Sequence, residues 1–142
     1  MDEPEAMAGS ARHIVVGVDG SEGASRAVAL AVRLAVDLVA EVIVVHGTLS
    51  SPEGRPTEEQ LARWCRPLSE AGVATRTVVE ADDAVRLLHR VGEIEDAYAI
   101  VVGSSGRSEL REFVIGGVAI ELAHHGNRPL MIAPTAVAEI AW

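Results

Sequence analysis

A glycine-rich stretch near the carboxyl end of the chain has residue types and spacing suited to holding a phosphate. Gly103-Ser-Ser-Gly106 is followed by nine residues and then by Gly116-Gly117. Glycine lets the backbone approach a ligand closely, and the unpaired N–H groups at a helix N-terminus favour an anion. Arg107 adds positive charge in the same stretch. On spacing alone, an ordinary loop with glycine turns explains the pattern equally well.

Few other residues have side chains that could bind a ligand or take part in catalysis. Asp19 follows an apolar run in an Asp-Gly-Ser sequence, where its carboxylate either contacts a ligand or caps the next helix from the turn. On the residues alone, the second role is favoured. His124 and His125 are adjacent and point about 100° apart on a helix, so they do not share a metal ion. His46 ends an apolar run, and we expect a hydrogen-bonded core histidine. We predict no metal site and no catalytic residue.

The elements that must position these residues follow from the apolar pattern. Short β-branched runs alternate with helical patterns in the order βαβαβαβαβ, which predicts an open parallel five-stranded sheet with helices on both faces. Ligands of such sheets bind outside the carboxyl ends of the strands. The predicted strands are 13–18, 41–46, 73–79, 98–102 and 130–133, and the predicted helices are 25–39, 57–71, 83–91 and 117–124.

Three local sequence signals indicate where the predicted helices begin and end. Thr57-Glu-Glu-Gln60 fits a capping box, in which the two side chains bond to each other's backbone N–H groups. Pro67 should bend or shorten the helix that follows, and Gly72 should end it. Asp82 is expected to cap the next helix.

Composition excludes several functional classes. The 142 residues correspond to one domain, and all 12 basic residues are arginine. A chain without lysine has no P-loop lysine and no Schiff-base lysine. The net charge of −9 argues against nucleic acid or an anionic membrane as a partner. The lone Cys65 excludes an internal disulfide, and no apolar run is long enough to span a membrane, so we expect a cytoplasmic protein.

The chain divides into three parts. Residues 1–11 are predicted to be a disordered acidic tail, 12–135 the α/β domain, and 136–142 a C-terminal tail. The last strand is short and apolar and, at a sheet edge, would need to be covered. Pairing with a second copy about a twofold axis would cover it. The predicted dimer interface consists of Leu130, Met131, Ile132 and Ala133.

Three segments of the chain resemble the universal stress proteins. They are VDGSEGASRAVALAVRLA, VIVVHG and VVGSSGRSELREFVIGGVAIELAHHGNRPLMIAP, and the resemblance covers roughly 12–135. The last segment is the most specific. The resemblance implies a Rossmann-like sheet in the order 3-2-1-4-5 and usually a dimer.

ATP-binding members of that family carry Gly-x-x-Gly, nine residues, and then Gly followed by Ser or Thr. The resemblance therefore implies that the chain holds the nucleotide through the adenosine contacts Asp19 and Gly47 and the phosphate-loop residues Gly103, Gly106, Arg107, Gly116, Gly117 and Val118. Mg²⁺ is expected only together with the nucleotide.

Two departures weaken that match. Gly117 stands where the family has a hydroxyl, and losing a hydrogen bond to a charged group costs roughly 1.5–3 kcal/mol. Ser104, Ser105 and Ser108 offer partial compensation. The Ala81-Asp82-Asp83 stretch also differs from the family, and its acids would repel phosphate if they faced the cleft.

Three functions remain in competition. The first is a stress-response protein that binds ATP or another adenine nucleotide as a sensor or regulatory module. The alternative is a nucleotide-free dimeric interaction protein of the same fold, favoured by Gly117. A slow ATP hydrolase ranks last, because no spacing selects a base from Asp82, Asp83 and Glu109.

Overall fold

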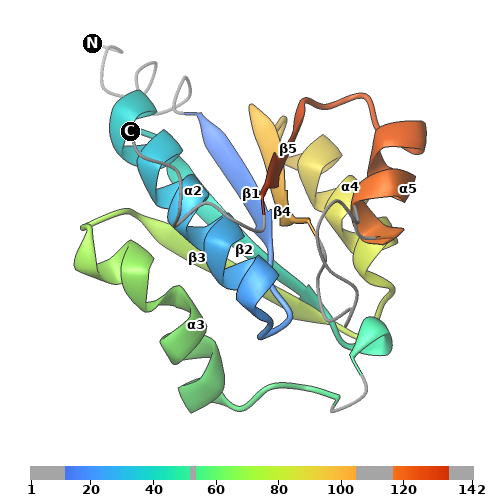
Figure 1. Cartoon of the computed structure of the whole chain (residues 1–142), viewed down its shortest axis with the longest axis horizontal. Coiled ribbons are helices and arrows are strands. Elements are labelled where there is room, and N and C mark those ends of the chain that lie inside the picture. Colours follow the sequence, from blue (N-terminus) through green and yellow to red (C-terminus); the bar gives the residue numbers. More distant parts are fainter. Residues whose placement is uncertain (1–11, 52–53, 105–116, 135–142) are drawn as a thin grey trace, which may run out of the picture.

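The five strands lie side by side in the order β3-β2-β1-β4-β5, and every neighbouring pair is parallel (Figure 1). The structure is a computed structural model that describes residues 12–51, 54–104 and 117–134. The strands are β1 (His13–Gly17), β2 (Glu41–Gly47), β3 (Thr75–Glu80), β4 (Ala99–Gly103) and β5 (Leu130–Ala133). The helices are α2 (Glu22–Leu38), α3 (Glu58–Glu70), α4 (Ala84–Ile94) and α5 (Gly117–His125), with a short 3₁₀ turn η1 (Thr48–Ser50). The predicted fold class and strand order are confirmed.

Helices cover both faces of the sheet. Successive residues of a strand point to opposite faces, so Val16 and Val44 pack under α2 and α3, whereas Val15 and Ile43 pack under α4 and α5. All four of these valine and isoleucine side chains are fully buried. The near-continuous apolar runs therefore reflect a central sheet buried on both sides, with two helices on each face (Figure 1).

Helix starts agree with the predicted capping signals, with one correction. Thr57 Oγ1 accepts the Gln60 N–H at 3.0 Å, and Gln60 Oε1 accepts the Thr57 N–H at 2.9 Å, so the capping box is confirmed. The prediction that Asp82 caps α4 is wrong. Asp83 is the cap, and its Oδ2 accepts the Arg86 N–H at 3.1 Å. Both acids fit the sequence pattern, and only the backbone path of the preceding turn selects one.

Pro67 is expected to bend or shorten α3; the shortening does not occur, and the bend stays a prediction. The helix continues to Glu70, three residues beyond the proline. A proline in a helix removes one N–H hydrogen bond, but the next residue, Leu68, is fully buried against the sheet. That burial holds the last turn in place. The chain then reverses at Gly72, which has a φ of +72°.

Several other bounds differ from those predicted. α2 begins three residues earlier than expected because Ser21 Oγ accepts the Ala24 N–H at 3.1 Å and caps it there. β3 begins at Thr75 instead of Val73, whose N–H donates to the Leu68 carbonyl at 3.0 Å and so still belongs to the end of α3. The predicted tails, 1–11 and 136–142, lie outside the described residues.

Candidate functional site

The strand order changes direction between β1 and β4. β1 pairs with β2 on one side and with β4 on the other. The chain passes from β1 to β2 and β3 and then crosses the sheet to β4 and β5. Parallel sheets of this kind bind ligands at such a switch point, outside the carboxyl ends of the strands. Asp19 follows β1 and Gly103 ends β4, so the topology brings these two predicted site residues to the same edge.

Asp19 stabilises the turn that leads into α2. Its Oδ1 accepts the Ser21 N–H at 3.0 Å, while Ser21 itself caps the helix. The side chain is half-buried beside Val18, which is fully covered. The side-chain cap of α2 is thus Ser21, whereas Asp19 bonds within the preceding turn instead of capping the helix as expected. A ligand contact of Asp19 stays a prediction.

Gly103 is required by packing within the protein. A Cβ at this position would lie 2.5 Å from the carbonyl carbon and oxygen of Gly23, in the first turn of α2. Real Cβ atoms do not approach backbone so closely, so α2 and β4 meet through two glycines. The glycine pattern therefore has a structural cause here, whether or not the backbone also approaches a ligand.

Ser104 follows directly and has a hydroxyl without a described partner. The residue is 7% exposed, and none of the described residues hydrogen-bonds to its Oγ. Buried hydroxyl groups normally have a partner. An unpaired donor next to β4 at the switch point fits a phosphate oxygen or another acceptor.

The start of α5 has free space on the side of the described residues. Gly117 is exposed, and a Cβ added there would have no heavy atom of those residues within 4 Å. Val118 is half-buried and packs against the core beneath α4 and α5. The first N–H groups of a helix have no partner within the helix, so this end offers donors to an anion. Gly106, Arg107 and Gly116 lie outside the described residues.

The end of β2 is closed on one side. A Cβ on Gly47 would lie 2.6 Å from the Asp82 carbonyl oxygen and 3.0 Å from the Ala84 nitrogen. The Leu49 N–H donates to the same carbonyl at 3.2 Å. The turn between β3 and α4 therefore lies against β2, and only glycine allows this approach. A contact of Gly47 with adenosine would use its backbone.

The two acids of this turn are engaged with the helix that follows them. Asp82 Oδ1 accepts the Asp83 N–H at 2.7 Å, and Asp82 Oδ2 lies 3.2 Å from Arg90 Nη2. The same Arg90 nitrogen lies 2.7 Å from Glu80 Oε1. Hydrogen bonds to Glu80 and then to Asp82 raise the pKa of the Arg90 guanidinium. Of the two acids that departed from the family pattern, Asp82 is paired with Arg90 and lies 3.5 Å from Arg86, whereas Asp83 caps α4. The pairing lowers the electrostatic cost of a nearby phosphate at Asp82 alone.

His46 is a hydrogen-bonded core residue, as predicted. It is 3% exposed, and its Nδ1 lies 2.7 Å from the Val18 carbonyl oxygen. A carbonyl only accepts, so Nδ1 carries the proton. The imidazole ring also packs on Trp64, with centroids 5.6 Å apart. The sequence did not reveal this pair, because the two rings come from different elements with no shared periodicity.

A model of the universal stress protein family matches residues 10–134. The chain belongs to the universal stress protein family. The resemblance stated from the sequence is therefore confirmed across the described sheet and its four described helices. No curated protein matches the chain.

Solved structures show the same family relationship. A universal stress protein in complex with cAMP has 26% identity and a TM-score of 0.69, covering 89% of this chain and 98% of that one. A member from Burkholderia pseudomallei has 25% identity and a TM-score of 0.66, covering 87% and 96%. One from Archaeoglobus fulgidus in complex with dAMP has 23% identity and a TM-score of 0.66, covering 85% of this chain and 96% of that one. At that identity, the similarity is evidence for the fold alone.

Neither a metal-binding cluster nor a membrane-spanning helix is present among the described residues. They contain no group of three or more His, Cys, Asp or Glu side chains arranged to hold a metal ion. None of their helices combines the length and apolar character needed to cross a membrane.

Proposed function

We propose that this universal stress protein binds an adenine nucleotide at the carboxyl ends of β1 and β4 and acts as a sensor or regulatory module. The observation that carries the proposal is the convergence at the switch point of Asp19 and the buried, unpaired Ser104 hydroxyl. The cAMP complex of a relative with 26% identity supports the adenine class.

The chain's own residues divide into two groups. Asp19 and the Gly47 backbone would contact the adenosine, following the family pattern. Ser104 Oγ and the first N–H groups of α5, at Gly117 and Val118, would hold phosphate oxygens. Gly106, Arg107 and Gly116 stay predictions for the same phosphates.

ATP is the proposed nucleotide, with Mg²⁺ bound only through its phosphates. Phosphates carry the charge that Mg²⁺ requires, and the ion usually takes only one or two protein carboxylates in addition. We assign no catalytic residue and propose no turnover. A cytoplasmic location also belongs to this proposal.

The decisive experiment adds the missing hydroxyl. Gly117→Ser places a side chain where, among residues 12–51, 54–104 and 117–134, no heavy atom lies within 4 Å. A new hydrogen bond to a charged phosphate is worth roughly 1.5–3 kcal/mol, so ATP affinity should rise ten- to a hundredfold by calorimetry. Ile120→Ser, at a position 48% exposed on the same helix, is the matched control and should leave the affinity unchanged.

Two further variants and a second ligand test whether the phosphates bind at the glycine-rich stretch. Gly106→Val and Gly116→Glu should abolish binding with the fold intact, since both block backbone access to phosphate. AMP should bind more weakly than ATP if the phosphates lie at α5. Absence of heat and of thermal stabilisation with millimolar ATP, in both the wild type and Gly117→Ser, would refute the proposal.

The second candidate is a nucleotide-free dimeric interaction protein. Gly117 favours it, because the usual hydroxyl is missing, and so does β5, which pairs only with β4 and lies at the sheet edge. Leu130, Met131 and Ile132 are half-buried there, and Ala133 is buried. Light scattering at several concentrations measures the mass. A stable dimer without any nucleotide binding would favour this candidate over the sensor.

A further inference from the structure

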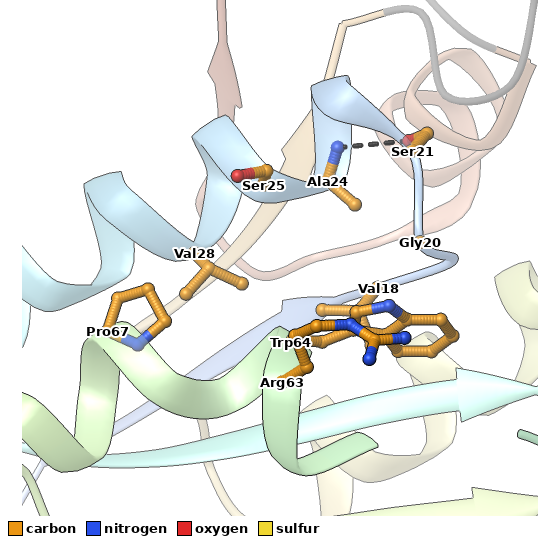
Figure 2. A pocket seen from close by; sticks show the side chains of 9 residues that line it. All are labelled: Val18, Gly20, Ser21, Ala24, Ser25, Val28, Arg63, Trp64 and Pro67. Carbon is orange, nitrogen blue, oxygen red and sulfur yellow. Dashed lines mark hydrogen bonds between the residues drawn. The ribbon is translucent and has the colours of Figure 1, made fainter. Parts of the chain in front are cut away.

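A cavity lies between the first two turns of α2 and the middle of α3 (Figure 2). Its volume is about 200 Å³. The turn after β1 forms part of its wall through Val18 and Gly20. None of the residues predicted to hold a nucleotide lines it. Asp19 lies between the lining residues Val18 and Gly20, so the cavity adjoins the proposed nucleotide site at this turn and extends along α2 and α3.

Trp64 forms a rigid wall of this cavity. Its ring packs on the buried His46 at 5.6 Å between centroids and an interplanar angle of 52°. On the turn side, a Cβ at Gly20 would lie only 2.7 Å from the indole, and Gly20 has a φ of +84°. Glycine at this turn thus allows the indole to lie tightly against the backbone. Val28 and Pro67 complete an apolar lining, which suits a flat apolar group.

Arg63 supplies a positive charge at the same cavity. Figure 2 shows its side chain beside Trp64 on α3, across from Ser21 and Ser25 of α2. Arg63 is exposed, and no ion pair joins it to a carboxylate among the residues that the structure describes. Arg90, by contrast, pairs with two acids. An arginine without an acidic partner, in a chain of net charge −9, is available to an anion.

Size and charge together define the ligand class. An apolar cavity of about 150 Å³ holds a benzene molecule, so about 200 Å³ accommodates one ring with a small substituent. Arginine recognises carboxylates through its fork of N–H donors. We propose that this cavity binds a single-ring aromatic carboxylate, with the ring against Trp64 and the carboxylate at Arg63. Ser25 offers a hydroxyl at the opposite rim.

Benzoate is the probe, and Trp64 fluorescence is the first readout. The chain has two tryptophans, so Trp142→Phe leaves Trp64 as the sole reporter. Benzoate should change its emission saturably, and benzamide, a neutral molecule of the same shape, should bind about fivefold more weakly. The modest factor reflects solvent screening of an exposed guanidinium. Equal affinity for the two probes, or no saturable change with benzoate, would overturn the proposal.

Two variants localise the binding. Arg63→Gln should weaken benzoate about fivefold and leave benzamide unchanged, whereas Arg66→Gln, an exposed arginine of the same helix outside the cavity lining, should change neither. Ser25→Leu should fill the cavity and abolish both. Thermal unfolding confirms that each variant is folded. Unaltered benzoate affinity in Arg63→Gln, or in folded Ser25→Leu, would place binding elsewhere and refute the assignment, whatever the outcome of the ATP titrations.

Discussion

The two glycines that open and close the phosphate-loop pattern should respond to alanine with opposite signs. In Gly103→Ala the new methyl group would lie 2.5 Å from the carbonyl carbon and oxygen of Gly23 and 3.0 Å from its Cα. These are backbone atoms of a helix's first turn, which cannot rotate away as a side chain would. Overpacking typically costs 1–3 kcal/mol, and alanine recovers about 0.4–1 kcal/mol by restricting the unfolded chain. The difference between the midpoints of these ranges is a net destabilisation of about 1.3 kcal/mol.

Gly117→Ala is the matched control. In the part of the chain that the structure describes, no heavy atom lies within 4 Å of the position its methyl would take. Alanine is the better helix former by about 0.8–1.0 kcal/mol in a helix interior, and by less at the first residue of a helix. We therefore expect this variant to be more stable than the wild type by about 0.5 kcal/mol.

Urea unfolding followed by circular dichroism measures both changes. A loss of about 1.3 kcal/mol corresponds to a fall of roughly 3–5 °C in Tm for a domain of this size. The slope of the unfolding free energy against urea concentration should stay the same, because the retained fold exposes the same surface on unfolding. Wild-type stability in Gly103→Ala would refute the packing explanation and leave ligand approach as the reason for glycine at that position.

Two further predictions concern α3. Thr57→Ala removes one half of the capping box and should lower the free energy of unfolding by about 1 kcal/mol; an unchanged urea midpoint would contradict the cap. Burial raises the pKa of the Cys65 thiol above its ordinary value of 9.0. Its reaction with a disulfide reagent at pH 8 should therefore be slower in the folded protein than in urea. Because the unfolded thiol ionises first, the free energy of unfolding should decline as pH rises through 9; equal reaction rates in both states would contradict this burial effect.

Much of the fold was predictable because it depends on local patterns. Alternating apolar runs and helical periods specify a parallel α/β sheet without any knowledge of distant contacts. The capping box at Thr57 and Gln60 is equally local, since both hydrogen bonds close within four residues. The strand order came from the family resemblance, because connection lengths alone leave several orders open.

The candidate site was less predictable, because the contacts of its residues are with partners far along the chain. Gly103 could be recognised as a motif residue, but its contact with Gly23 arises only when α2 packs on β4. The sequence pattern predicted Asp82 as the cap of α4, but the path of the turn makes Asp83 the cap. The neutralising contacts of Arg90 also span a strand, a turn and a helix.

The sequence by itself determined the class of fold and the family, because periodicity, turns and glycine spacing depend on neighbouring residues. Only the tertiary structure decided which polar groups lack a partner among the described residues. Ser104 is buried without a described partner, and Arg63 has no described acidic partner at a cavity lined by Trp64. The burial of a side chain and its hydrogen-bond or ion-pair partners depend on how separate elements pack, so no local sequence pattern predicts them.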